Sequence, residues 1–125
     1  MAKLLIGPLL RYVAETSATV WVETDAPCQV RVLGTTTPTF TVAGHHYALV
    51  IVEGLAPATV VAYQVHLDDA LVWPLPDSPL PLSVIRTLGE PGELRVIFGS
   101  CRAAAPHRDR PEEAQPPQQR FGHAA

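Results

Sequence analysis

The chain has 125 residues, of which 47% are apolar and 17% are charged, and its formal net charge is −3. This length is enough for one small domain with a modest core. The mild negative charge excludes a basic surface for nucleic acid or for an anionic membrane, and no apolar run approaches the ~20 residues that span a bilayer.

The first apolar run is interrupted by Gly7 and Pro8, and no small-residue cleavage site follows it. We therefore expect no secretory signal peptide and a cytoplasmic location. Cys28 and Cys101 are the only cysteines, and without a secretory signal they are expected to be reduced thiols.

Short apolar stretches separated by turn residues, at intervals of about 8–12 residues, fill the chain up to residue 88, which is typical of an all-β sandwich. We predict about seven strands and no helix. The segments with strand character are residues 4–13, 18–24, 28–33, 39–42, 47–55, 60–67, 71–73 and 83–87.

The second segment shows the alternation of a strand most clearly. Val20 and Val22 share one face, and Trp21 and Glu23 share the other. The two-residue period alone leaves open which face is inward, because Trp21 carries the largest apolar area.

Two stretches between strands are predicted to be loops. Residues 34–38 combine a glycine, threonines and a proline, and residues 74–81 contain too few N–H donors for a β-ladder. The second stretch could also be a PxxP ligand for a partner, but it lacks flanking basic residues, so a rigid loop is the preferred reading.

The composition changes after residue 88. Residues 89–92 form a linker, and the continuous apolar run 94–98 is predicted to be a strand buried on both faces of a larger α/β sheet. Residues 106–125 have no apolar period and are expected to be a disordered tail. The predicted organisation is thus a sandwich (1–88), a linker with the first strand of a missing domain (89–105) and a tail (106–125).

The run Gly54-Leu55-Ala56-Pro57-Ala58-Thr59, followed by Tyr63, resembles the corner that precedes the sixth strand of fibronectin type III domains. The resemblance implies a fibronectin type III or immunoglobulin-like sandwich in which Leu55, Pro57 and Tyr63 are structural residues, together with Trp21. In that corner the tyrosine hydroxyl bonds back to the backbone. Tyr63 stands four residues after Thr59 instead of two, so the bond requires a bulge or an extension.

Residues 1–107 resemble the N-terminal part of the alkaline phosphatase D (PhoD-like) family, in which such a sandwich precedes a metallophosphatase domain. The run Phe98-Gly99-Ser100-Cys101 matches the end of the first strand of that domain. The resemblance implies that Cys101 occupies an iron-ligand position, and that full-length relatives hydrolyse phosphate esters with iron and calcium.

The other metal ligands of that family have no counterpart in this chain, and one thiolate does not hold a metal. We therefore expect no catalytic residue and no cofactor here, and interpret the chain as a truncated, non-catalytic accessory domain whose partner in full-length relatives is their own catalytic domain. The alternative is a stand-alone sandwich that serves as a protein-interaction module; an unstable fragment is a further reading.

Other chemistry-bearing residues form no convincing site. His45 and His46 would point to opposite faces of a strand, and His66 alternates outward. Ser100 lacks a nucleophile elbow and triad partners. The acidic residues are scattered over turns and the tail, with no paired carboxylates.

Overall fold

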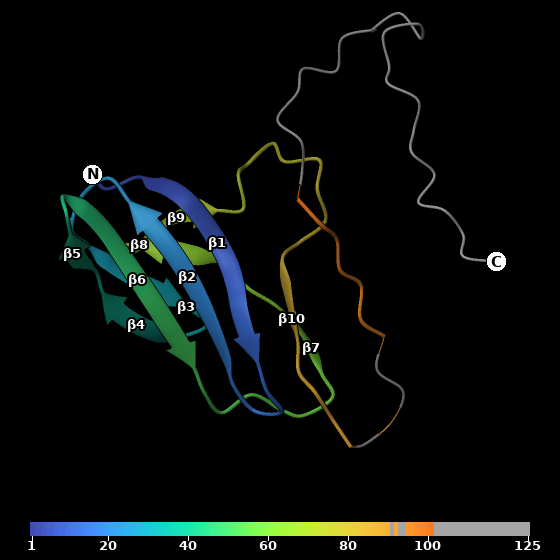
Figure 1. Ribbon diagram of the computed structural model, residues 1–125. Coiled ribbons are helices and arrows are strands. Elements are labelled where there is room, and N and C mark those ends of the chain that lie inside the picture. The colour runs from blue at the N-terminus through green and yellow to red at the C-terminus, as the bar shows by residue number, and fades with distance from the viewer. Residues whose placement is uncertain (91, 93–94, 102–125) are drawn as a thin grey trace, which may run out of the picture. The chain divides into compact units, whose positions relative to one another are not determined.

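The computed structural model describes residues 1–90, 92 and 95–101 (Figure 1), and this part of the chain contains ten strands and no helix. This confirms the predicted all-β fold. The strands are β1 (Leu4–Val13), β2 (Ala18–Thr24), β3 (Gln29–Val32), β4 (Thr35–Pro38), β5 (Phe40–Val42), β6 (His45–Val52), β7 (Val60–Ala62), β8 (Val65–Leu67), β9 (Ala70–Trp73) and β10 (Val84–Arg86).

Two antiparallel four-stranded sheets form the sandwich. Sheet A has the strand order β1-β2-β6-β5, and sheet B has the order β4-β3-β8-β9. In Figure 1 the strands β1, β2 and β6 lie side by side in front of β3, β8 and β9. The strand β1 lies at the edge of sheet A, a position that tolerates a proline such as Pro8 within a strand.

The remaining pair, β7 and β10, continues the ladder of sheet B after an interruption. β8 pairs with β9 and β7 pairs with β10, while the Tyr63 N–H donates to the Ser83 carbonyl at 3.0 Å between these ladders. The proline-rich stretch 74–81 is a loop between β9 and β10, as predicted. The Trp73 indole N–H donates to Ser83 Oγ at 3.0 Å across the base of this loop.

Three hairpins have two-residue turns in which both residues have a positive φ: Leu33-Gly34, Ala43-Gly44 and Asp68-Asp69. This is the signature of type I′ turns, whose twist matches that of the flanking strands. The loop predicted for residues 34–38 was wrong for residues 35–38. Because Gly34 (φ +82°) completes a tight turn, these residues return as β4 and pair with β3.

The core lies between the inner faces of the two sheets. Val20 and Val22 of β2 and Val50 of β6 are fully buried against β3 and β8, and Ile85 of β10 is also fully buried. Burying each such side chain contributes about 1.5–3 kcal/mol. The inward position of the valines places the half-buried Trp21 on the outer face of sheet A, which answers the question that the alternation left open.

The bend in β1 requires a glycine. Gly7 has φ +105°, and a Cβ atom there would lie 2.7 Å from the carbonyl oxygen of Trp21. The pairing of β1 with β2 shifts register between Ile6 and Leu9, on either side of this position. The bend therefore depends on the absence of a side chain at residue 7.

Residues 95–101 belong to a second unit and form no regular secondary structure. Their apolar side chains are strongly exposed: Val96 at 68%, Ile97 at 89% and Phe98 at 92%. The predicted strand 94–98 begins outside the described residues, and the predicted tail 106–125 lies wholly outside them. Among the described residues, no helix is long and apolar enough to cross a membrane.

Residues 54–59 lead from β6 into β7, and Thr87 stabilises this connection. The Thr87 hydroxyl lies 2.6 Å from the Ala56 carbonyl, to which it donates, and accepts the Thr59 N–H at 3.0 Å. Leu55 packs against the core and Tyr63 is 6% exposed within it, whereas Pro57 is exposed. Among the described residues no hydrogen bond joins the Tyr63 hydroxyl to the corner backbone.

Replacing Thr87 by valine should lower the free energy of unfolding by about 1–3 kcal/mol, because the Thr59 N–H and the Ala56 carbonyl lose a partly buried partner. Chemical denaturation measures this change. The matched control is Thr36→Val on the exposed face of β4, which should change stability by less than about 0.5 kcal/mol. Equal stability of the two variants would contradict the role of Thr87.

Candidate functional site

The outward side chains of sheet A form a largely apolar surface, which we call the outer face of sheet A. Strand pairing arranges them in three rows across the sheet. The rows are Tyr12–Thr19–Ile51, Leu9–Trp21–Leu49 and Ile6–Glu23–Tyr47–Phe40.

This surface exposes large apolar side chains next to one another. Leu9 of β1 is 44% exposed, and Leu49 and Ile51 of β6 are 40% and 51% exposed, with Trp21 of β2 between Leu9 and Leu49. An antiparallel sheet that faces water normally carries polar residues on its outer side. A contiguous apolar patch at such a position indicates an interaction site.

An aromatic cluster occupies the third row and its neighbours. The Tyr47 ring stacks on Trp21 with 5.3 Å between ring centroids, and it lies 5.9 Å from Phe40 and 6.0 Å from the His45 ring. Contacts of this kind add about 0.5–1.5 kcal/mol per pair beyond their buried area. The cluster therefore gives this part of the face a fixed shape.

The carboxylate of Glu23 lies within the aromatic cluster. Glu23 is only 8% exposed, and its Oε1 is 3.5 Å from His45 Nδ1. Desolvation raises the pKa of Tyr47, and the negative charge of Glu23 and a hydrogen bond to it raise this pKa further. The arrangement anchors side chains, but it brings together no nucleophile and base.

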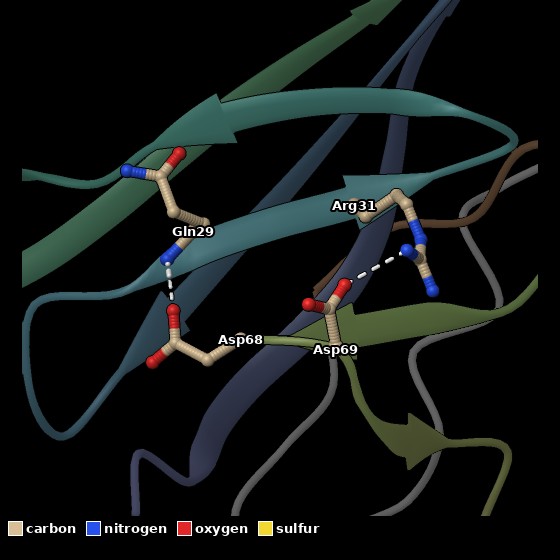
Figure 2. Close-up of polar contacts among 4 residues, drawn as sticks. All are labelled: Gln29, Arg31, Asp68 and Asp69. Atoms are coloured by element: carbon tan, nitrogen blue, oxygen red, sulfur yellow. Dashed lines mark hydrogen bonds and ion pairs between the residues drawn. The ribbon is translucent and has the colours of Figure 1, made fainter.

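The outer face of sheet B has a different character. Arg31 forms an ion pair with Asp69 at 2.9 Å, and Asp68 Oδ1 accepts the Gln29 N–H at 2.9 Å (Figure 2). His66 lies opposite Arg31 and alternates with buried residues, as predicted. An exposed ion pair contributes at most about 1 kcal/mol to stability. It nevertheless gives the charged groups of Arg31 and Asp69 a partner within the domain.

A second apolar surface is a groove of about 490 Å³ between the start of β1 and β9. Its lining is mostly aliphatic and includes Leu4, Leu5, Leu71, Trp73 and Leu75. Lys3 is the one charged residue in the lining of the groove, so few polar groups are available to orient a small molecule.

The predicted metal-related residues do not come together. Cys101 is exposed, and no group of three or more His, Cys, Asp or Glu side chains able to hold a metal occurs among residues 1–90, 92 and 95–101. His45 and His46 diverge as their spacing predicts, because His45 approaches Glu23 while His46 Nδ1 is 2.8 Å from Thr41 Oγ1. The role of Cys101 as an iron-ligand position stays a prediction.

Sequence reasoning missed the outer face of sheet A, although a signal was present. Residues 47–52 read Tyr-Ala-Leu-Val-Ile-Val, a run that is apolar on both sides of the strand. Strands that are apolar on both sides usually pack against other elements on both faces. The run therefore indicated an apolar surface on the second side of this strand.

Fold and surface together define a two-sheet β-sandwich domain with one apolar and one polar outer face. A family model described as a domain of unknown function, DUF7800, matches residues 1–85, and the chain belongs to that family. No curated protein and no solved structure matches the chain.

The two thiols should react at different rates. Cys28 is 8% exposed, and burial raises the pKa of its thiol, so little reactive thiolate is present there. Ellman's reagent at pH 8 should therefore label one exposed thiol per folded chain rapidly, and the second only on unfolding. Cys101→Ser should remove the rapid phase; rapid labelling that persists in this variant would contradict the assignment.

Replacing Glu23 by glutamine should lower the pKa of Tyr47, because the negative charge that opposes the phenolate is removed. Tyrosine ¹³Cζ chemical shifts recorded between pH 8 and 12 measure this change. Glu53→Gln, an exposed position beyond the end of β6, is the control and should leave the Tyr47 signal unchanged. An unchanged Tyr47 titration in Glu23→Gln would contradict the contact.

Proposed function

We propose that this chain is a non-catalytic accessory domain that works beside a metallophosphatase domain of the PhoD-like kind. The observation that carries the proposal is the segment after the sandwich. Val96, Ile97 and Phe98 are 68–92% exposed and run directly into Gly99-Ser100-Cys101. Exposing three consecutive apolar side chains to water costs free energy. Their burial in the sheet of another domain would remove this cost.

The outer face of sheet A gives independent support. A sandwich that worked alone in water would be expected to carry polar side chains there, as sheet B does. The proposed accessory role gives this apolar surface a partner. In this role the sandwich, residues 1–88, stabilises the hydrolase domain and supplies no residue to bond cleavage.

The family resemblance supplies the proposed chemistry of the partner, which is the hydrolysis of phosphate esters with iron and calcium. Within this chain Cys101 would contribute one thiolate ligand, and borderline metals accept such a ligand. The remaining ligands would come from the hydrolase domain, so the proposed centre is complete only in the larger assembly.

A stand-alone protein-interaction module is the second candidate, because an apolar outer face also fits a separate partner. The exposed segment 96–98 favours the accessory role. A module would need its sandwich alone, whereas the accessory role uses both the sandwich and the exposed apolar segment that follows it.

The purified chain, supplied with iron and calcium, should hydrolyse bis-p-nitrophenyl phosphate no faster than the metal blank. Cys101→Ser should behave identically, because one thiolate does not assemble a metal centre. Turnover above the blank that disappears in Cys101→Ser would contradict the non-catalytic role. Preferential binding of an unrelated protein, with none to a hydrolase domain, would favour the interaction module.

A further inference from the structure

We infer that the apolar groove between the start of β1 and β9 binds a fatty acid, that is, a single alkyl chain that ends in a carboxylate. All residues that line this groove belong to the sandwich. The ligand would therefore bind whether the chain works as an accessory domain or as a separate interaction module.

The groove lies where both sheets end on the same side of the sandwich. β1 is an edge strand of sheet A, β9 is an edge strand of sheet B, and residues of both strands line the groove. The lining continues into the core, since Ala2 is buried in the core and both Leu4 and Val72 pack against it. An alkyl chain in the groove therefore extends the apolar interior of the sandwich.

Exposed aliphatic side chains stand beside this lining. Leu5 of β1, Leu71 of β9 and Leu75 of the proline-rich loop are 56%, 53% and 58% exposed. The indole N–H of Trp73 is already bonded to Ser83 Oγ at 3.0 Å, so this residue needs no polar partner in the groove. An alkyl chain covers these side chains without burying a polar group of its own.

The size and the charge of the groove specify the ligand. Its volume of about 490 Å³ lies within the usual range for ligand sites. At about 30 Å³ for each water-sized group, this volume holds on the order of ten to fifteen carbon atoms. Lys3 is the one charged residue of the lining, and among the described residues its ammonium group forms no ion pair. A carboxylate at the end of the alkyl chain supplies the opposite charge.

A peptide and a membrane fit the groove less well. A peptide strand added to the edge of β1 would lack a donor at Pro8, and the irregular register of β1 between Ile6 and Leu9 disrupts such a ladder. The net charge of −3 opposes attraction to an anionic membrane. A free fatty acid requires neither a regular strand edge nor a basic surface.

The test titrates dodecanoate, below its micelle concentration and at pH 8, into the full 125-residue chain. Methyl NMR spectra should show saturable shifts at Leu5, Leu71 and Leu75, which line the groove. From octanoate through decanoate to dodecanoate, the affinity should rise roughly twofold to fourfold for each added methylene group. Dodecyltrimethylammonium, which has the same chain and a cationic head, should bind more weakly than dodecanoate.

Three variants locate the ligand. Leu71→Gln in the groove and Ile51→Gln on the outer face of sheet A change aliphatic side chains of matched exposure, 53% and 51%. Leu71→Gln should weaken dodecanoate binding roughly fivefold to twentyfold, and Ile51→Gln less than about twofold. Lys3→Gln should weaken it about twofold to fivefold, because the exposed ion pair is lost.

Thermal unfolding shows whether each variant is folded, and Leu71→Thr, which introduces a β-branched side chain, replaces Leu71→Gln if glutamine disrupts β9. Absence of saturable binding, or a loss in Ile51→Gln as large as that in Leu71→Gln, would overturn the site. Unchanged dodecanoate binding by Lys3→Gln would overturn the carboxylate head. Binding to phosphatidylglycerol vesicles that Leu71→Gln abolishes, or a dimer that dodecanoate dissociates, would assign the groove to a membrane or to a second copy and overturn the fatty acid as its ligand.

Discussion

The register between β2 and β6 is the constraint on which the rest of the structure depends. Seven consecutive residue pairs, from Ala18–Val52 to Thr24–His46, join the two strands without a bulge. This register places Val20 opposite Val50 inside the sandwich and Trp21 opposite Leu49 outside it. Because side chains alternate with a period of two, a slip of one residue in β2 relative to the core would turn its valines outward and bring Trp21 and the Glu23 carboxylate inside.

The same register creates the difference between the two outer faces. In sheet B the outward side chains include Arg31 and His66 beside the exposed Leu71, and Arg31 forms an ion pair with Asp69 in water. In sheet A, β6 is apolar on both sides, so that Leu49 and Ile51 are left outside when Val50 and Val52 are buried. The aromatic contacts of Tyr47 and the carboxylate of Glu23 hold one end of this surface in place. A surface this apolar and this well ordered is suited to contact with another domain.

The sequence predicted what depends on local alternation and missed what depends on context. The sandwich and the grouping of Val20 with Val22 on one face followed from period-two patterns, whereas the inward side of residues 18–24 was left open and was decided by the structure. The β3–β4 hairpin was missed because Leu33 has φ +47°, a conformation that a bulky residue seldom adopts, and only Gly34 marked the turn. The outer face of sheet A was missed because a strand that is apolar on both sides does not reveal how many layers cover it. The assignment of Cys101 to an iron-ligand position stays a prediction. The ligands of a metal site come together only in the tertiary structure, and the described residues bring no group of ligands together.

The central claim, that sheet A buries one apolar side and presents another to solvent, is tested most directly by methyl NMR spectroscopy of the isolated chain with a soluble paramagnetic compound. The account predicts strong broadening of the methyl signals of Leu9, Leu49 and Ile51, and little broadening for Val20 and Val50. Equal protection of both sets of methyl groups would contradict the account, because it would mean that the outer face of sheet A is already covered within the chain.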